Sequence, residues 1–244
     1  MTPVRFDHVS KAFGPQQILD DVSFDVPSAT AFCLLGRSGA GKSVILRHIV
    51  GLVRPDSGRV FIGDQDITAL PGRQLAGVRK QMGFLFQSAA LFDSMSVGEN
   101  VAFPMRRHTD WSNDTIRDRA QQKLADVGLD AAYDKMPADL SGGMKKRAGL
   151  ARAMALDPDI LLVDEPSAGL DPITAGEIDA LLVKTKKAGT TLVVVTHNIP
   201  SARVIGDTFA VLHEGHILEN GTIEALDASD EPIVQAFMGA RGGG

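Results

Sequence analysis

The sequence predicts an α/β fold, and three observations support this prediction. Residues 36–43 read Gly-Arg-Ser-Gly-Ala-Gly-Lys-Ser and fit the phosphate-binding pattern G-x-x-x-x-G-K-[ST]. The apolar run 31–35 before them is typical of a buried strand, and residues 44–50 after them are typical of a helix. Two further apolar runs, 160–163 and 190–196, are each followed by polar side chains suited to nucleotide chemistry.

Glycines make the segment 36–43 suitable for holding phosphate. They let the backbone turn its N–H groups toward phosphate oxygens, and the following helix N-terminus adds positive charge. Lys42 would reach the β- and γ-phosphates, and the Ser43 hydroxyl would bind Mg²⁺. A plain glycine-rich turn is the alternative, but the Lys-Ser pair and both flanks favour phosphate. The nucleotide-binding residues predicted here are Gly36, Arg37, Ser38, Gly39, Ala40, Gly41, Lys42, Ser43 and Val44.

Composition limits the classes of protein that fit. The chain has 244 residues and a formal net charge of −5, which argues against a surface built for nucleic acid. Cys33 is the sole cysteine, so no disulfide can form within the chain, and a reducing compartment is expected. The first residues lack a signal-peptide pattern, and no apolar run approaches the roughly 18–20 residues of a membrane span. We therefore expect a soluble protein that acts at a membrane only through a partner.

Residues 4–35 predict strands separated by turns. Val4, Phe6 and His8 alternate with polar residues, as do Val22, Phe24 and Val26, so a small antiparallel sheet is expected before the phosphate-binding segment. Phe13 lies at a turn between these strands. It could stack on an adenine ring or simply pack in the turn, and its chemistry alone favours neither.

The next strand prediction carries one polar candidate. Residues 60–67 suggest a hairpin around Gly63 and Asp64, and residues 70–80 suggest an exposed helix. The apolar strand 82–86 then ends at Gln87. Ligands bind at the carboxyl ends of strands in such sheets, so Gln87 could bind Mg²⁺ through its side-chain carbonyl and position a water molecule. A lone glutamine would otherwise be an ordinary surface residue.

Residues 88–158 predict a helical insertion. Apolar residues in 113–127 have helical spacing and end at Gly128, and 145–155 form a second predicted helix. The latter is preceded by Ser141, Gly142 and Gly143, which offer a hydroxyl and backbone N–H groups at a helix N-terminus. These residues therefore form a second candidate anion-binding site, although an ordinary helix cap has the same composition.

The apolar strand predicted at 160–165 ends in two carboxylates. In an enzyme with a phosphate-binding loop, the first, Asp164, would hold Mg²⁺ and the second, Glu165, would polarise the attacking water. Neighbouring residues of an extended strand point to opposite sides, so the two carboxylates can take different roles.

A histidine follows the last buried strand predicted, 190–196. His197 can reach a γ-phosphate there, although a lone loop histidine would carry no such meaning. Before it, residues 176–188 predict a helix whose lysines, Lys184, Lys186 and Lys187, face solvent. Residues 200–205 predict a short helix, and 209–219 predict a hairpin that explains His213 and His216 better than a metal site does.

In this order, the motifs resemble the ATP-binding subunit of an ABC transporter, over nearly the whole chain. The resemblance implies an ABC ATPase fold: a P-loop NTPase (RecA-like) core with an N-terminal antiparallel β-subdomain and an inserted α-helical subdomain. It implies a nucleotide-binding lobe from 1–87 and 157–240, a helical signature subdomain at 88–156 and a flexible tail at 241–244. The implied ligands are ATP and Mg²⁺.

The resemblance also assigns residue roles. It implies Phe13 as the aromatic that stacks on adenine, Gln87 as the Q-loop and Ser141, Gly142 and Gly143 as the signature that contacts phosphate. Asp164 and Glu165 match Walker B and the catalytic base, Asp171 closes the D-loop, and His197 matches the switch histidine. Three positions depart from the usual pattern: Phe13 replaces tyrosine, Met144 replaces glutamine, and Asn198 stands where an acidic residue is frequent.

Residues 86–103 and 140–147 are similar to the Mla/Mce branch, which moves phospholipids or other lipids between bacterial membranes. This implies a homodimer of ATPase subunits, each copy closing its signature over the partner's ATP. It also implies a permease dimer, an MCE lipid-binding protein, a STAS-domain subunit in some systems, and a place on the cytoplasmic face of the inner membrane. We expect the permease contact at an exposed apolar cluster: Leu91, Phe92, Met95 and Val97.

Other functions remain open from the sequence. An importer of a small polar solute would carry the same motifs, because other subunits select the substrate. An ABC-type ATPase of DNA repair or translation, and a scaffold that binds nucleotide without hydrolysis, are the remaining alternatives. The chain shows no basic patch or long coiled-coil insertion typical of the former, and it retains Glu165 and His197, which argues against the latter.

Overall fold

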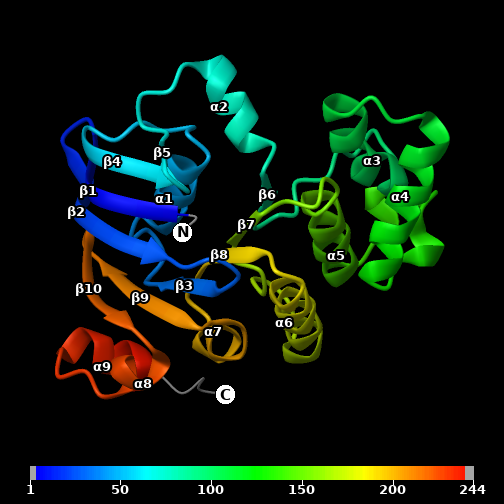
Figure 1. Ribbon diagram of the computed structural model, residues 1–244. Coiled ribbons are helices and arrows are strands. Elements are labelled where there is room, and N and C mark those ends of the chain that lie inside the picture. The colour runs from blue at the N-terminus through cyan, green and yellow to red at the C-terminus, as the bar shows by residue number, and fades with distance from the viewer. Residues whose placement is uncertain (1–3, 240–244) are drawn as a thin grey trace.

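The computed structural model describes residues 4–239, in which strands gather on one side and a group of helices stands apart on the other (Figure 1). The tail expected at 241–244 lies outside the described residues. A four-stranded antiparallel sheet, in the order β2-β1-β4-β5, confirms the β-sheet expected near the N-terminus. Its strands are β1 (Val4–Phe13), β2 (Gln16–Val26), β4 (Ser57–Ile62) and β5 (Gln65–Asp66).

An irregularity in β1 breaks the alternation predicted for this strand. The pairing register shifts between Phe6 and Val9, and His8 there has a left-handed φ of 52°. The bulge sends His8 to the surface, where its Nδ1 lies 2.6 Å from Asp21 Oδ1, while Val9 becomes fully buried. The alternation predicted for Val4, Phe6 and His8 is therefore wrong at His8, because one extra residue reverses the face that follows.

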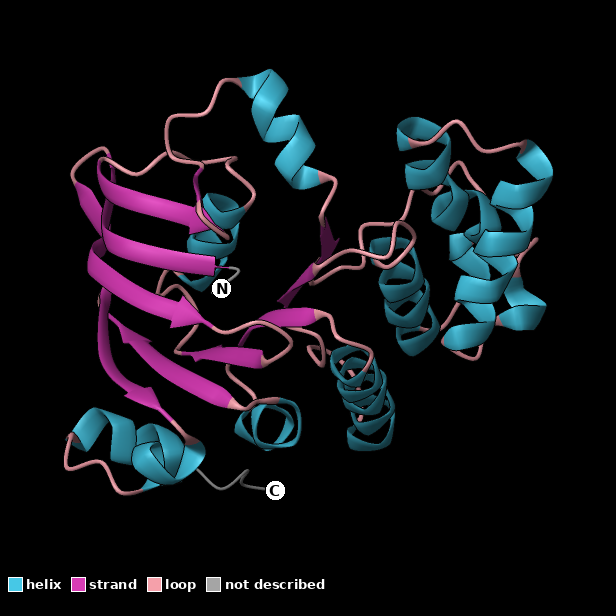
Figure 2. Ribbon diagram, in the orientation of Figure 1, coloured by secondary structure: helices cyan, strands magenta, loops and turns pink. Residues whose placement is uncertain are grey.

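A second, six-stranded sheet forms the centre of the molecule (Figure 2). Its order is β10-β9-β3-β8-β7-β6, with parallel pairing throughout except for the antiparallel edge strand β10. Most of its inner strands are buried along their length, as expected for parallel strands covered on both faces. The strands are β3 (Ala31–Leu35), β6 (Met82–Leu85), β7 (Ile160–Asp164), β8 (Thr191–Thr196), β9 (Thr208–His213) and β10 (His216–Gly221).

Two apolar clusters show which elements cover the central sheet. Leu34 and Val193 pack with α1 and the antiparallel sheet, whereas Cys33 and Val194 pack with the helices of the opposite face. The helices of the strand-bearing part are α1 (Lys42–Ile49), α2 (Gly72–Arg79), α6 (Pro172–Lys187), α7 (Ile199–Ile205), α8 (Ile223–Asp227) and α9 (Pro232–Gly239).

Helix α6 differs from its prediction at two points. It begins at Pro172, a turn before the expected start, because Asp171 caps it and proline suits the first helical position. Lys186 is also not the solvated residue that was predicted. Its Nζ lies 2.8 Å from both Asp207 Oδ1 and the Ile205 carbonyl, and its side chain is only 15% exposed.

The remaining helices form the separate group drawn in green in Figure 1: α3 (Val97–His108), α4 (Asn113–Asp126), α5 (Gly142–Ala153) and the short 3₁₀ turns Asp130–Ala132 and Pro137–Asp139. Helix α4 confirms the helix expected at 113–127. Helix α3 was not predicted, although Ser96 and Glu99 form a capping box that marks its start.

No helix in residues 4–239 has both the length and the apolar character needed to cross a bilayer.

Cys33, the sole cysteine of the sequence, is buried in β3 as a free thiol, and burial raises its pKa to about 12. This thiol is therefore protonated and unreactive at neutral pH.

Candidate functional site

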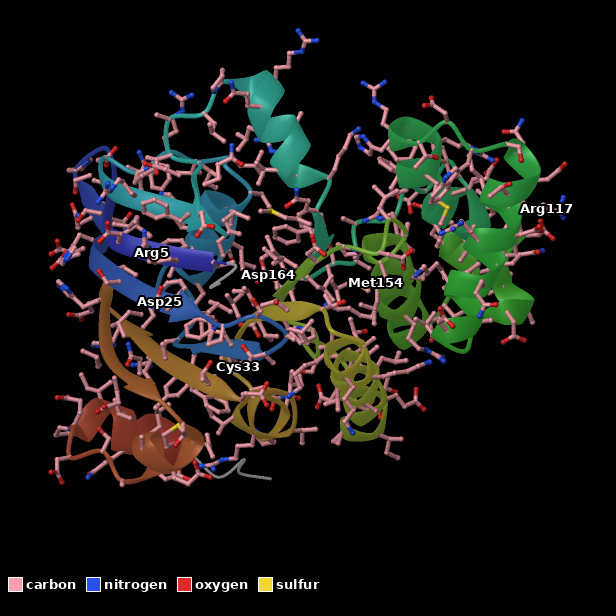
Figure 3. All side chains as sticks on the ribbon, viewed as in Figure 1. Arg5, Asp25, Cys33, Arg117, Met154 and Asp164 are labelled. Carbon is pink, nitrogen blue, oxygen red and sulfur yellow. The ribbon has the colours of Figure 1, made fainter. Side chains whose placement is uncertain are left out.

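The sequence motifs meet where neighbouring strands of the central sheet end. Strands β3, β8, β7 and β6 are adjacent and parallel, so their carboxyl ends lie along one edge. Gly36 follows β3, His197 follows β8, and Asp164 closes β7. In Figure 3, Asp164 lies near the middle of the molecule, between the strands and α5. Ligands bind at this edge in open α/β sheets.

The phosphate-binding segment wraps around the N-terminus of α1. Gly41 and Gly39 have φ values of 101° and 84°, which residues with side chains rarely adopt. At Gly36, a Cβ atom would lie 2.6 Å from the Leu212 carbonyl oxygen, so the chain can pass there only without a side chain. These positions fix a tight loop whose helix N-terminus carries partial positive charge.

Lys42 places a buried cation inside this loop. Its side chain is 7% exposed, and its Nζ donates to the carbonyl oxygens of Gly36 at 2.7 Å and Arg37 at 3.2 Å. The same Nζ lies 3.5 Å from Glu165 Oε1. The ammonium group therefore bridges the phosphate-binding loop and the carboxylate after β7.

Ser43 and Asp164 form a pair of oxygen donors beside the loop. The Ser43 hydroxyl donates to Asp164 Oδ1 at 3.3 Å, and burial raises the pKa of Asp164 although this hydrogen bond opposes the shift. One carboxylate and one hydroxyl suit Mg²⁺, which keeps several waters and is completed by phosphate oxygens. Residues 4–239 contain no cluster of three or more His, Cys, Asp or Glu able to hold a metal.

Glu165 is held by contacts to β8. Its Oε1 lies 2.9 Å from His197 Nδ1, and its Oε2 accepts from the Thr196 hydroxyl at 3.1 Å. The residue has a left-handed φ of 46°, so it has left the strand, which ends at Asp164. The prediction that both carboxylates lie on one extended strand is therefore wrong, although their side chains do contact different partners.

Asn198 connects the histidine segment to the loop that follows Glu165. Its Nδ2 donates to the Ser167 hydroxyl at 3.1 Å, and its Oδ1 accepts from the Ser201 backbone N–H at the start of α7. An asparagine can cap a helix with its oxygen while its amide group donates elsewhere. The sequence did not predict this contact. The cap preceding Pro200 was a signal that could have indicated part of it.

The signature segment and Asp171 lie at helix starts. Ser141 caps α5 by accepting from the Met144 backbone N–H, and Asp171 caps α6 in the same way. A Cβ atom on Gly143 would lie 2.3 Å from Thr174 Cγ2, so the two helix starts pack closely. Ser141 and Gly142 remain exposed and available to a ligand.

The structure does not bring every predicted site residue together. Among the described residues, polar contacts join Lys42 and His197 to Glu165, and Ser43 to the adjacent Asp164. Phe13 is 46% exposed with Lys11 Nζ 5.4 Å from its ring, and Gln87 is exposed beyond β6. Neither these two residues nor the signature glycines contact that group. The residues predicted for the ATP site therefore comprise one group held together by polar contacts and several others that lie apart from it.

The apolar cluster expected to face the permease needs correction at Val97. Val97 is fully buried at the start of α3, and Leu91 is half-buried against the same core. The exposed aromatic residues are instead Phe86, Phe92 and Phe103, at 40%, 43% and 39% exposure. They line a groove of about 460 Å³ between β6, α3 and α5. Helix α3 turns Val97 inward, which a prediction that lacked this helix could not anticipate.

Lys146 is a further buried polar residue near the site that the sequence did not single out. It lies in α5, is 4% exposed, and donates from Nζ to the backbone carbonyl oxygen of Glu165 at 2.8 Å. Burial lowers its pKa to about 8. Its position one turn inside a helix, amid other basic residues, is typical of a surface lysine, so the pattern carries no signal of this contact.

Comparison with known proteins gives consistent matches. The family model described as ABC transporter matches residues 19–168. The chain is 41% identical over 231 residues to the intermembrane phospholipid transport system ATP-binding protein MlaF of Escherichia coli, covering 94% of this chain and 86% of that protein. It is 42% identical over 239 residues to the probable ribonucleotide transport ATP-binding protein mkl of Mycobacterium tuberculosis, covering 98% and 67%.

A solved structure extends the comparison to three dimensions. The ATP-binding cassette MJ0796, a dimer in a post-hydrolysis state bound to ADP and Pi, superposes with a TM-score of 0.83. It is 32% identical in sequence, and the match covers 90% of this chain and 98% of that one. The α/β arrangement with its separate helical group is therefore similar to that of an enzyme caught with its hydrolysis products.

Proposed function

This chain belongs to the ABC transporter family, and we propose that it is the ATP-hydrolysing subunit of a transporter that moves phospholipid between bacterial membranes. The main support for ATPase activity is the connected group of polar residues that the structure brings together at the strand ends: Lys42, Ser43, Asp164, Glu165 and His197. The 41% identity to MlaF, over 86% of that protein, supports phospholipid as the cargo.

Each residue of the connected group has a task in phosphoryl transfer. The Glu165 carboxylate orients and polarises the water that attacks the γ-phosphate, and His197 steadies both that carboxylate and the phosphate. Lys42 compensates the negative charge that develops on the phosphate oxygens. Ser43, Asp164 and Gln87 would hold Mg²⁺, which would neutralise negative charge on the phosphates.

A complete ATP site in this proposal needs two copies of the chain. Ser141, Gly142 and Gly143 form a second anion-binding helix start on α5, and none of them contacts the connected group. In a homodimer, this helix start would cover the ATP held by the other copy, and Asp171 would lie nearby. Phe13 would stack on the adenine. The dimeric state of the similar cassette MJ0796 supports this arrangement.

The permease contact is proposed at the aromatic groove. Phe92 packs against Phe103 with ring centroids 5.0 Å apart, and Arg152 lies 5.7 Å from the Phe92 ring centroid. Such an exposed apolar groove fits a helix of a membrane subunit. Leu91 and Met95 remain part of the proposed contact, and a permease dimer here would hold the chain on the cytoplasmic face of the inner membrane. An MCE lipid-binding protein and a STAS-domain subunit complete the proposed assembly.

Ribonucleotide transport is the second candidate cargo. The 42% identity to mkl favours it, although the chain spans only 67% of that protein's length. The ATP site would be the same in both cases, because the membrane subunits select what is moved. The cargo must therefore be tested on the assembled transporter.

The test has two parts. Phosphate release by the purified chain with Mg²⁺ and ATP should be measurable and should increase when its membrane subunits are present. Those subunits, identified by co-purification, should be reconstituted between donor and acceptor vesicles that contain fluorescent phospholipid. ATP-dependent phospholipid movement supports the proposal, and ATP-dependent movement of labelled ribonucleotide alone would replace it with the second candidate.

A further inference from the structure

Lys146 is a buried cation for which the proposed reaction has no role. It lies in α5 with 4% of its surface exposed, and its Nζ donates to Glu165 O at 2.8 Å. The Asp164 and Glu165 carboxylates also attract its charge and partly oppose the effect of burial on its pKa. Removing an ammonium group from water costs several kcal/mol unless hydrogen bonds offset the loss. The lowered pKa of Lys146, about 8, reflects that cost.

The contact acts on the backbone of the proposed catalytic residue. Glu165 has a left-handed φ of 46°, which is uncommon for a residue with a side chain. Its carbonyl oxygen accepts from the Ala168 backbone N–H at 3.3 Å and from Lys146 Nζ at the shorter distance of 2.8 Å. These two bonds set the peptide plane that follows Glu165, and that plane helps to direct the carboxylate toward Thr196 and His197.

Lys146 lies on the same helix as the signature. Ser141 caps α5, and Lys146 is one turn further along the same rigid element. In the proposed dimer, the start of this helix binds the ATP of the other copy. A displacement of α5 that accompanies binding of that ATP would therefore be transmitted directly to the Glu165 backbone.

We propose that Lys146 is a positioning residue that aligns Glu165 for hydrolysis when the start of α5 binds the ATP held by the other copy. Lys146 would thereby couple the two ATP sites of the dimer, the one that α5 covers and the one at which Glu165 acts. The inference rests on the proposed function and adds a physical connection between the signature on α5 and the catalytic carboxylate of the same copy. The contact passes through a backbone oxygen, so it leaves both carboxylate oxygens free for the histidine, the threonine and water.

Lys146→Met is the informative variant. Methionine has a similar length and volume but no donor, and the Glu165 carbonyl keeps its bond from Ala168, so folding should survive. We expect kcat for ATP to fall about tenfold or more, which corresponds to about 1.4 kcal/mol of transition-state stabilisation. The KM and the Kd for ATP should stay within about twofold, because Lys42 and its loop are untouched.

Two further variants separate positioning from folding. Lys145→Met removes the neighbouring lysine of α5, whose side chain is half-buried and forms no hydrogen bond or ion pair with another described residue, and should behave like the wild type. Lys146→Arg keeps a charged donor and should have a higher kcat than Lys146→Met. Thermal melting of Lys146→Met should match or exceed that of the wild type, since replacement of a buried charge by an apolar side chain is often neutral or stabilising.

Three results would overturn the inference. They are an unchanged kcat in Lys146→Met, an equal loss in Lys146→Arg, and a loss of kcat that follows a parallel loss of ATP binding and melting temperature. An inactive wild-type chain is a distinct outcome, because it contradicts the proposed ATPase function itself and removes the reaction that Lys146 would serve.

Discussion

The Nδ1 atom of His197 lies 2.9 Å from Oε1 of Glu165, joining the ends of two neighbouring parallel strands. The Glu165 backbone N–H also donates to the Val195 carbonyl oxygen at 2.9 Å, so both the main chain and the side chain of Glu165 are fixed to β8. This arrangement leaves little freedom for the carboxylate and suits a residue that must orient one water molecule.

We expect Glu165→Gln to reduce kcat for ATP at least 100-fold while ATP binding is retained. An amide keeps the shape and can still hydrogen-bond to Thr196 and His197, but it cannot accept a proton from water. Phosphate release measures the rate, and size-exclusion chromatography with ATP should detect a trapped dimer. Steady-state turnover equal to that of the wild type would remove Glu165 as the base.

A charge placed in the aromatic groove should separate ATP hydrolysis from transport. Phe92→Asp should leave the ATPase rate of the isolated chain within about twofold, because Phe92 is 43% exposed and its ring lies against Phe103 and Arg152, which are outside the connected group. It should abolish co-purification with the permease, since a carboxylate cannot be buried against an apolar helix without a large cost.

The matched comparison is Val97→Asp. Val97 is fully buried, so this substitution should unfold the helical group instead of affecting binding alone. Normal assembly and lipid transport by Phe92→Asp would show that the permease binds elsewhere.

The Asn198 contacts can be separated by two substitutions. Asn198→Ala removes both the cap of α7 and the donor to Ser167, and should lower the free energy of unfolding by about 1 kcal/mol. Asn198→Asp retains an oxygen that can accept from the Ser201 N–H and should cost less than about 0.5 kcal/mol. Urea unfolding measures both, and equal losses in the two variants would contradict the capping role.

Stability should fall in mild acid because of His48. Burial lowers its pKa below 6.5, and its Nε2 is buried without a partner among residues 4–239. Below about pH 6.5 the unfolded chain therefore binds a proton that the folded chain refuses, so the free energy of unfolding decreases as pH falls through this range. The contribution is fully present above pH 6.5.

Thermal melting between pH 5 and 7.5 checks this prediction. In His48→Leu the decrease should be smaller than in the wild type, because the titrating group is gone. The same decrease in both proteins would assign the acid sensitivity to other groups.

Local patterns in the sequence were sufficient to predict most of the strands and the connected part of the site. The strand–loop–helix at residues 31–50 and the Asp164–Glu165 pair after an apolar run are local signals, since each needs only neighbouring residues to be recognised. Their meeting at one edge follows from parallel pairing of the strands.

The features that were missed depend on tertiary structure or on weak local signals. The burial of Val97 depends on a helix recognisable only by its capping box, and the bulge at His8 needs the partner strand to define it. The contacts of Lys146 and Lys186 depend on helices packing against distant loops. Helices α8 and α9 are short, and such segments carry little periodicity.

The pairing of β3 with β8 also has a kinetic consequence. Leu35 aligns with Thr196, so the phosphate-binding loop meets the histidine segment only through a contact between residues far apart in the sequence. Closing such a long loop is slow, and contacts of this range form with the global fold. Recovery of ATP hydrolysis during refolding should therefore lag behind the formation of helices, and early compact intermediates should be catalytically silent.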